Sequence, residues 1–201
     1  MPSIYQLKPA FQNILRPVVR SLARAGVTPN QVTVAAMALS FGAGACIVAA
    51  PGGRWPLFVL PAALLLRMAL NAIDGVLARE YQLTSRAGAV LNEVGDVVSD
   101  AAMYLPLGFV EGLSASWVVV VVVLGIVSEM TGVVAQALMG ERRYDGPMGK
   151  SDRAFVFGVL ALALAVGVRR GWYLDLVLAV NALLLVVTIM NRARAAARGG
   201  S

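Results

Sequence analysis

The sequence has no histidine, only one cysteine and few charged residues, and each shortage excludes a class of chemistry. Without histidine, a general base has to be a carboxylate or a rarer group. A single cysteine, Cys46, excludes a disulfide framework and a Cys-rich metal site. Charged residues make up 14% of the 201 residues, well below the ~25% of soluble domains. The composition therefore disfavours a soluble globular protein.

Long apolar segments are abundant, because 59% of the residues are hydrophobic. Residues 32–50 and 118–139 are almost entirely apolar, and ~20 such residues cross a hydrocarbon core ~30 Å thick. The pattern predicts an all-α integral membrane protein with a single membrane domain over residues 1–201. We expect transmembrane helices at about residues 31–50, 57–79, 85–110, 116–139, 153–168 and 173–191.

The segment at about residues 8–25 has a different pattern. Apolar residues recur at helical spacing, and Arg16, Arg20 and Arg24 occupy the opposite side. This pattern predicts an amphipathic helix lying in the membrane surface. A short soluble helix that packs on the bundle is the alternative.

The basic residues indicate the orientation in the membrane. If the N-terminus is cytoplasmic, most of the 17 Lys and Arg residues fall on the cytoplasmic side. Only Arg54, Arg169 and Arg170 fall on the opposite side, and Arg67 lies within a span. By the positive-inside rule, we expect a multi-pass protein of the inner (cytoplasmic) membrane with both termini in the cytoplasm.

Acidic residues first appear at Asp74, and five of the 11 lie between residues 71 and 100. On the helix predicted at 57–79, Arg67, Asn71 and Asp74 share one face. On the helix predicted at 85–110, polar residues repeat every four positions, at Asn92, Asp96 and Asp100. A short loop makes the two helices antiparallel neighbours, so we expect their polar stripes to face each other.

These polar residues lie within the inner half of the membrane. With a rise of ~1.5 Å per residue, Asp74 is about 7 Å and Asp96 about 15 Å from the cytoplasmic ends of their helices. An ionisable group facing lipid there costs at least ~2.5 kcal/mol, so both should point into the bundle. Oxygen ligands alone favour Mg²⁺, Mn²⁺ or Ca²⁺ over zinc. The alternative is purely structural, with interhelical hydrogen bonds and an ion pair to Arg67.

The stretch from residue 71 to 96 resembles the signature of the CDP-alcohol phosphotransferases. That signature reads D-x-x-D-G-x-x-A-R, then eight residues, then G-x-x-x-D-x-x-x-D. In this chain it reads Asn71-x-x-Asp74-Gly75-x-x-Ala78-Arg79, eight residues, then Gly88-x-x-x-Asn92-x-x-x-Asp96. The resemblance also implies an amphipathic N-terminal helix followed by six spans.

Two positions depart from this signature, because Asn71 and Asn92 replace acidic residues. The four positions therefore carry two negative charges where the family has four. The resemblance implies one or two Mg²⁺ or Mn²⁺ ions held by Asn71, Asp74, Asn92 and Asp96. Glu93 and Asp100 are the candidates for further ligands, and we include Asp100 among the metal residues. We expect one metal site to be weakened or recast.

The resemblance implies that a substituted phosphate moves from a CDP-linked lipid, expected to be CDP-diacylglycerol, to an acceptor alcohol with release of CMP. Asp96 stands at the position of the catalytic base. The residues implied in CDP binding are Gly75, Ala78, Arg79 and Gly88. Membrane lipid, and no nucleic acid, is the expected partner, and a homodimer is expected by resemblance alone. The active site is expected on the cytoplasmic side.

The acceptor alcohol stays open. A basic loop carries Arg142, Arg143, Lys150 and Arg153, which are candidates for binding a phosphate on the acceptor. These residues could equally be positive-inside anchors. Glu129 lies inside the predicted fourth span, and its partner is left open between the acceptor pocket, Arg67 and a dimer partner.

Two other functions are compatible with the pattern. Carboxylates at membrane depth also mark the ion paths of transporters and channels. Against a carrier, the six predicted spans show no internal repeat, and the polar residues gather at one membrane side. A family member that binds CDP-lipid without turnover is the other alternative, because of Asn71 and Asn92.

Overall fold

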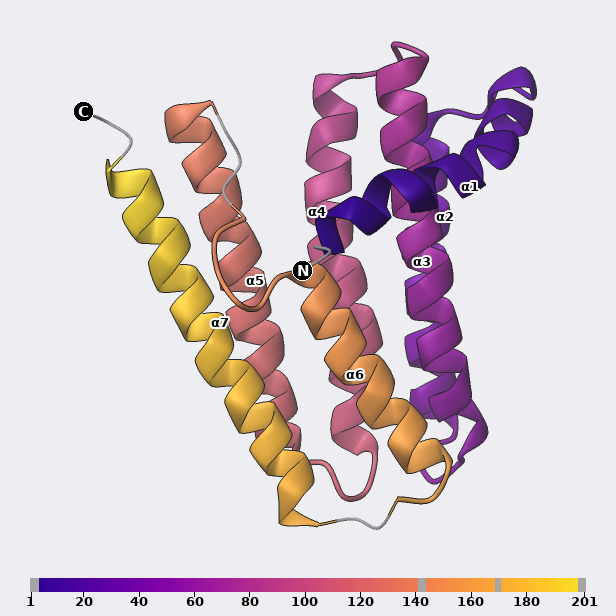
Figure 1. Ribbon diagram of the computed structural model, residues 1–201. Coiled ribbons are helices and arrows are strands. Elements are labelled where there is room, and N and C mark those ends of the chain that lie inside the picture. Colours follow the sequence, from indigo (N-terminus) through magenta and orange to yellow (C-terminus); the bar gives the residue numbers. More distant parts are fainter. Residues whose placement is uncertain (1–3, 141–143, 169–170, 199–201) are drawn as a thin grey trace. The chain divides into compact units, whose positions relative to one another are not determined.

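The computed structural model describes residues 4–140, 144–168 and 171–198, with side chains from residue 11 onward. The described part of the chain is helical and contains no strand (Figure 1). In chain order the elements are α1 (Ile4–Arg24), α2 (Pro29–Ala49), α3 (Trp55–Glu80), α4 (Arg86–Tyr104), the 3₁₀ helix η1 (Leu105–Phe109), α5 (Ala115–Met139), α6 (Lys150–Ala165) and α7 (Trp172–Arg198). The prediction of an all-α chain is confirmed.

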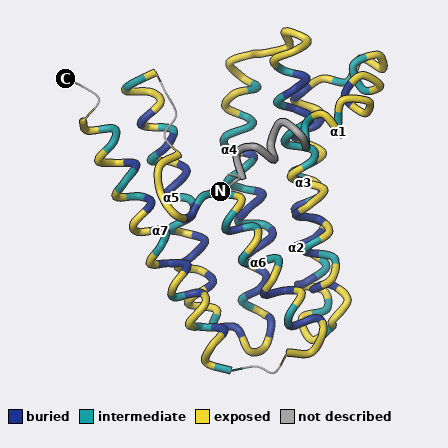
Figure 2. The backbone as a smooth tube through the Cα atoms, viewed as in Figure 1, coloured by how far each residue is buried: buried dark blue, intermediate teal, exposed yellow. Residues whose placement is uncertain are grey.

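Four of these helices, α2, α3, α5 and α7, are long and apolar enough to cross a membrane. α4 is not among them, because its 19 residues include the charged Glu93, Asp96 and Asp100. α6 is not among them because it has only 16 residues. Exposed residues recur along the four long helices (Figure 2). Many of them are large and apolar, for example Phe41, Leu65, Val123 and Leu183. Because water would disfavour such exposure, the described helices are those of a membrane protein.

Two helix ends differ from those expected from the sequence. The helix predicted at 85–110 is α-helical only to Tyr104 and continues as η1. Pro106 explains the change, because proline has no N–H for the α-helical hydrogen bond and clashes with the preceding turn. The helix predicted at 173–191 runs on to Arg198.

The chain forms two compact units. One consists of Met1–Gly42 and Ala62–Ser99, and the other of Ala43–Pro61 and Asp100–Ser201. The helices α2, α3 and α4 each contribute to both units. The single domain predicted from the sequence stays a prediction.

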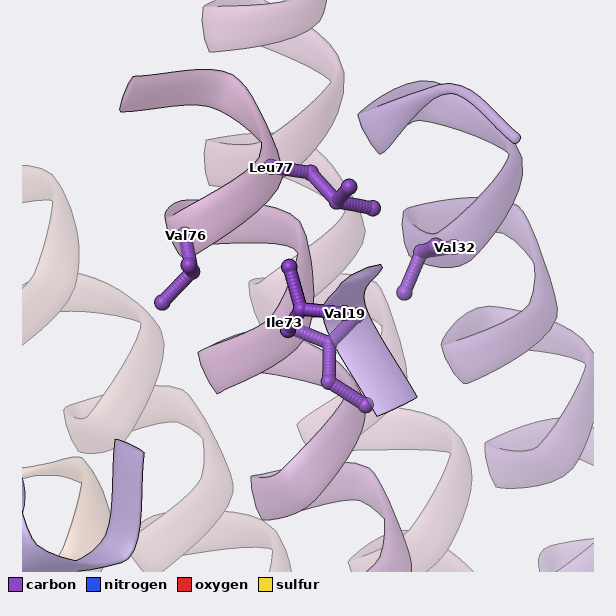
Figure 3. Packing of buried hydrophobic residues seen from close by; sticks show 5 residues of the cluster. All are labelled: Val19, Val32, Ile73, Val76 and Leu77. Carbon is purple, nitrogen blue, oxygen red and sulfur yellow. The ribbon is translucent and has the colours of Figure 1, made fainter. Parts of the chain in front are cut away.

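The first unit contains a hydrophobic cluster that joins α1 to α2 and α3 (Figure 3). Val19 of α1 and Val32 of α2 pack with three residues of α3, Ile73, Val76 and Leu77. Leu77 is completely buried. At the cytoplasmic end expected for α3, Arg16 and Glu80 form an exposed salt bridge of 3.1 Å. Since an exposed pair contributes little, the apolar cluster is what fixes α1 on α3.

In the second unit, α5 and α7 pack side by side (Figure 1). Tyr104 of α4 stacks on Phe157 of α6, with ring centroids 4.2 Å apart. The loop before α6 is tied to α7, because the backbone N–H of Met148 donates to the Thr188 hydroxyl at 3.0 Å. Asp152 then caps α6 by accepting from the Gly149 N–H at 2.8 Å. The basic N-terminus of α6 is thereby fixed.

Candidate active site

The polar stripes of α3 and α4 meet at Asp96. The Asn71 amide nitrogen donates to Asp96 Oδ1 at 2.9 Å. Arg67, one turn before Asn71, donates from Nη2 to the Asp96 backbone carbonyl at 3.0 Å and reaches Oδ1 at 3.5 Å. Arg67 is only 3% exposed. The catalytic candidate is therefore held by a buried cation and an amide, both from α3.

Asp74, the other carboxylate of the signature, is also buried, and α2 supplies a partner for it. The Thr33 hydroxyl lies 3.1 Å from Asp74 Oδ2 and 3.1 Å from the Pro29 carbonyl oxygen. We did not single out Thr33 in the sequence. The available signal was a hydroxyl residue one turn into an apolar helix, where such residues usually bond to the carbonyl four positions earlier.

The donor set at this site fits a hard divalent cation, because carboxylate and amide oxygens are the ligands that Mg²⁺ and Mn²⁺ prefer. Asn92 and Glu93 lie half-buried on α4. Within the described ranges, no three acidic, histidine or cysteine side chains gather as a metal-binding group. The four signature positions thus provide two carboxylates and two amides as possible ligands.

The glycines of the signature allow close packing. A Cβ at Gly88 would lie 2.6 Å from Asn30 Oδ1 and 2.8 Å from Ser85 Oγ, so these two side chains would have to move where α4 begins beside α2. Gly75 is covered by the guanidinium of Arg79, whose Nη1 would lie 3.3 Å from an added Cβ. Arg79 itself is exposed, and Ala78 is half-buried. An exposed cation thus folds over the small residues of α3.

Asp100 takes part in a different, buried charge cluster that lies in the second unit. Arg153 Nη2 binds Asp100 Oδ2 at 2.9 Å and Glu129 Oε1 at 3.2 Å. Arg192 lies 3.7 Å from the same Glu129 oxygen and donates to the Ser128 carbonyl at 2.6 Å. Arg153 is 2% exposed, and all four charged residues are buried. Two guanidinium groups therefore face two carboxylates in this cluster.

This cluster bears on the question left open for Glu129, because Glu129 forms ion pairs with Arg153 and Arg192. Arg192 was not expected from the sequence as a partner of Glu129, because it lay at the predicted end of the last span. Gly125 makes room for the cluster, since an added Cβ would lie 3.1 Å from Arg153 Nε.

The other residues predicted to bind a phosphate on the acceptor come at or before the start of α6 in the sequence. Lys150 is the first residue of α6 and is half-buried. Arg142 and Arg143 lie outside the described residues.

Comparison with known proteins identifies the family. The model of the CDP-alcohol phosphatidyltransferase family matches residues 26–191. The chain belongs to this family. The family expected from the resemblance is confirmed, and so is the enzyme class, a CDP-alcohol phosphatidyltransferase.

Two relatives of this phosphatidyltransferase cover most of its length. The inner membrane protein YnbA of Escherichia coli (strain K12) is 44% identical over 193 residues, which cover 96% of this chain and 95% of YnbA. A phosphatidylinositol phosphate synthase of Mycobacteroides abscessus is 30% identical and is matched over 92% of this chain and 84% of its own.

Solved structures share the fold. The crystal structure of the Mycobacterium tuberculosis phosphatidylinositol phosphate synthase PgsA1 with CDP-DAG bound has a TM-score of 0.76 at 22% identity and covers 92% of this chain and 94% of its own. The same protein in complex with manganese and citrate has a TM-score of 0.75, with coverage of 90% and 88%.

Proposed function

We propose that this phosphatidyltransferase takes its phosphatidyl group from CDP-diacylglycerol and transfers it to an acceptor alcohol that carries a phosphate. The observation that supports the reaction is the match to the family over residues 26–191, with Asp74 and Asp96 retained within the signature. The mycobacterial structure with CDP-DAG bound supports the choice of donor.

In the proposed reaction, the acceptor hydroxyl oxygen bonds to the phosphorus that carries diacylglycerol. The bond from this phosphorus to the bridging oxygen of the diphosphate breaks, and CMP leaves with that oxygen. Asp96 accepts the proton of the hydroxyl group. A buried guanidinium and an amide on Oδ1 hold the carboxylate in a fixed orientation, which a general base requires.

A divalent cation would be held by oxygen atoms from Asp74 and Asp96 together with the amides of Asn71 and Asn92. Bound there, it would neutralise the charge on the diphosphate and on the departing CMP. We assign Asp100, which was predicted as a further ligand, to its pair with Arg153.

Gly75, Ala78 and Gly88 are proposed to leave room for the CDP group. Arg79 provides an exposed positive charge beside them, which suits a diphosphate.

For the acceptor, we propose that Lys150, with Arg142 and Arg143, binds the phosphate. Arg153 was also predicted to bind this phosphate, but its guanidinium already binds Asp100 and Glu129. A phosphate that reached Arg153 would have to replace a carboxylate. The product named for the mycobacterial relatives, phosphatidylinositol phosphate, supports a phosphorylated acceptor.

We further propose that α2 to α7 all span the membrane, that α1 lies in its cytoplasmic surface, and that both termini and the active site are cytoplasmic. The distribution of basic residues supports this orientation. Exposed Ile14 and Val18 on α1 would enter the lipid. A homodimer remains part of the proposal by family resemblance.

The test is CMP release by the purified protein from CDP-diacylglycerol, with Mn²⁺ or Mg²⁺ and a panel of phosphorylated and free alcohols. We expect Asp96→Asn and Asp74→Asn to abolish release, and chelation by EDTA to stop it until Mn²⁺ or Mg²⁺ is restored. Asp175→Asn is the matched control, because Asp175 lies outside the signature and accepts a hydrogen bond from the Ser114 N–H at the start of α5. Full activity in both site variants would disprove the assignment. Activity with free alcohols alone would disprove the phosphorylated acceptor.

A further inference from the structure

Two side chains of α3 converge on one oxygen atom of Asp96. Arg67 Nη2 and Asn71 Nδ2 both approach Oδ1, at 3.5 Å and 2.9 Å. Arginine stays protonated in proteins, and Arg67 is 3% exposed, so its charge needs a counter-ion nearby. Asp96 provides that counter-ion, with Arg67 Nη2 3.5 Å from its Oδ1.

The amide at position 71 is decisive for this arrangement. With aspartate there, a carboxylate oxygen would stand where the Asn71 nitrogen stands, 2.9 Å from Asp96 Oδ1. Two carboxylates at such a distance cannot both stay ionised without a proton or a cation between them. An amide N–H makes a hydrogen bond at the same place and needs neither.

The charge balance points the same way. Replacing two aspartates of the signature by Asn71 and Asn92 removes two negative charges, which equals the charge of one divalent cation. With the positive charge of Arg67 counted, the remaining pair of Asp74 and Asp96 leaves a net charge of −1, which attracts one divalent cation and opposes a second one.

We propose that Arg67 and Asn71 hold Asp96 in place of a second divalent cation, so that this enzyme works with a single metal ion. The inference rests on the proposed function for the identity of the site. It assigns Arg67, which lies outside the family signature, as a positioning residue for the base.

The test counts bound Mn²⁺ on the purified protein in lipid nanodiscs by electron paramagnetic resonance, with and without CDP-diacylglycerol. We expect one Mn²⁺ per chain in the wild type. The double variant Asn71→Asp/Asn92→Asp should bind two, with the spin-coupled spectrum of ions ~3.5–4 Å apart. Asn13→Asp on α1 is the control: it makes the same kind of substitution, with one added negative charge, at an exposed position and should leave the count at one.

Arg67 is tested by its effect on affinity. Arg67→Gln removes a positive charge beside the cation, so Mn²⁺ should bind about 3- to 10-fold more tightly, whereas Arg67→Lys should stay near the wild-type value. A merely structural role would make the Gln variant bind Mn²⁺ more weakly, and that result would overturn the assignment of Arg67. Helical content from circular dichroism shows that each variant is folded.

Two Mn²⁺ ions in the wild type, or none, would overturn the inference. CMP release measured on the same samples separates the two proposals. Release of CMP by a protein that binds two ions would leave the proposed function standing and refute the single cation. If the wild type bound one Mn²⁺ but released no CMP from CDP-diacylglycerol with any acceptor, the proposed function would be refuted. The count of one ion would still agree with the charge balance.

Discussion

The buried charge cluster around Arg153 allows a quantitative prediction. Arg153→Met keeps a side chain of similar length but leaves the carboxylates of Asp100 and Glu129 without their shared guanidinium. At the 2.9 Å separation of Nη2 and Asp100 Oδ2, an effective dielectric constant of ~20 gives an attraction of about 6 kcal/mol before the desolvation of both groups is subtracted. Breaking a buried pair by removing one partner lowers the free energy of unfolding by about 3–5 kcal/mol, and we expect that loss.

The double variant Arg153→Met/Asp100→Asn should recover part of this stability. It removes one of the two stranded charges, while Glu129 keeps Arg192 at 3.7 Å. The assay is unfolding in mixed detergent micelles, followed by tryptophan fluorescence and circular dichroism, on the wild type, both single variants and the double variant. A loss below about 1 kcal/mol for Arg153→Met, or a double variant no more stable than Arg153→Met, would show that the cluster does not contribute in this way.

Two further substitutions test packing. Leu77→Ala removes a completely buried side chain from the cluster that joins α1 to α3, so the free energy of unfolding should fall by about 2–5 kcal/mol. Leu83→Ala is the control, because Leu83 is exposed. Equal losses in the two variants would contradict the reasoning. Gly125→Ala places a Cβ 3.1 Å from Arg153 Nε and should lower the free energy of unfolding by about 1–3 kcal/mol. Gly42→Ala, which meets nothing within 4 Å, should be neutral or stabilising in the same assay, and an equal loss there would rule out the steric cause.

The helices follow from local sequence. Runs of apolar residues of sufficient length predicted helices at 31–50, 57–79 and 116–139, and the structure has them at Pro29–Ala49, Trp55–Glu80 and Ala115–Met139. The helix break after Tyr104 was also readable, because Pro106 cannot continue an α-helix, but the apolar run past it favoured a longer helix. Local pattern determines such features since each depends on neighbouring residues alone.

The signature at residues 71–96 also came from sequence, because its spacing reflects which residues share a helix face. It predicted Asn71, Asp74, Asn92 and Asp96 as site residues. It also indicated the family, and the family is what the comparison confirms. It did not reveal that Asn71 and Arg67 bind the same oxygen atom of Asp96, or that Thr33 lies against Asp74.

What the sequence alone determined is therefore the helical membrane class and the enzyme family. Only the tertiary structure decided the partners of the buried charges. Glu129 had several possible counter-ions, and Asp100 stood on the same stripe as Asp96, yet the two carboxylates share Arg153. Such pairings depend on side chains that are far apart in the chain, as with Asp100 and Arg153, which are 53 positions apart. Helical periodicity places each of them on a face, but only packing brings particular atoms within reach of one another.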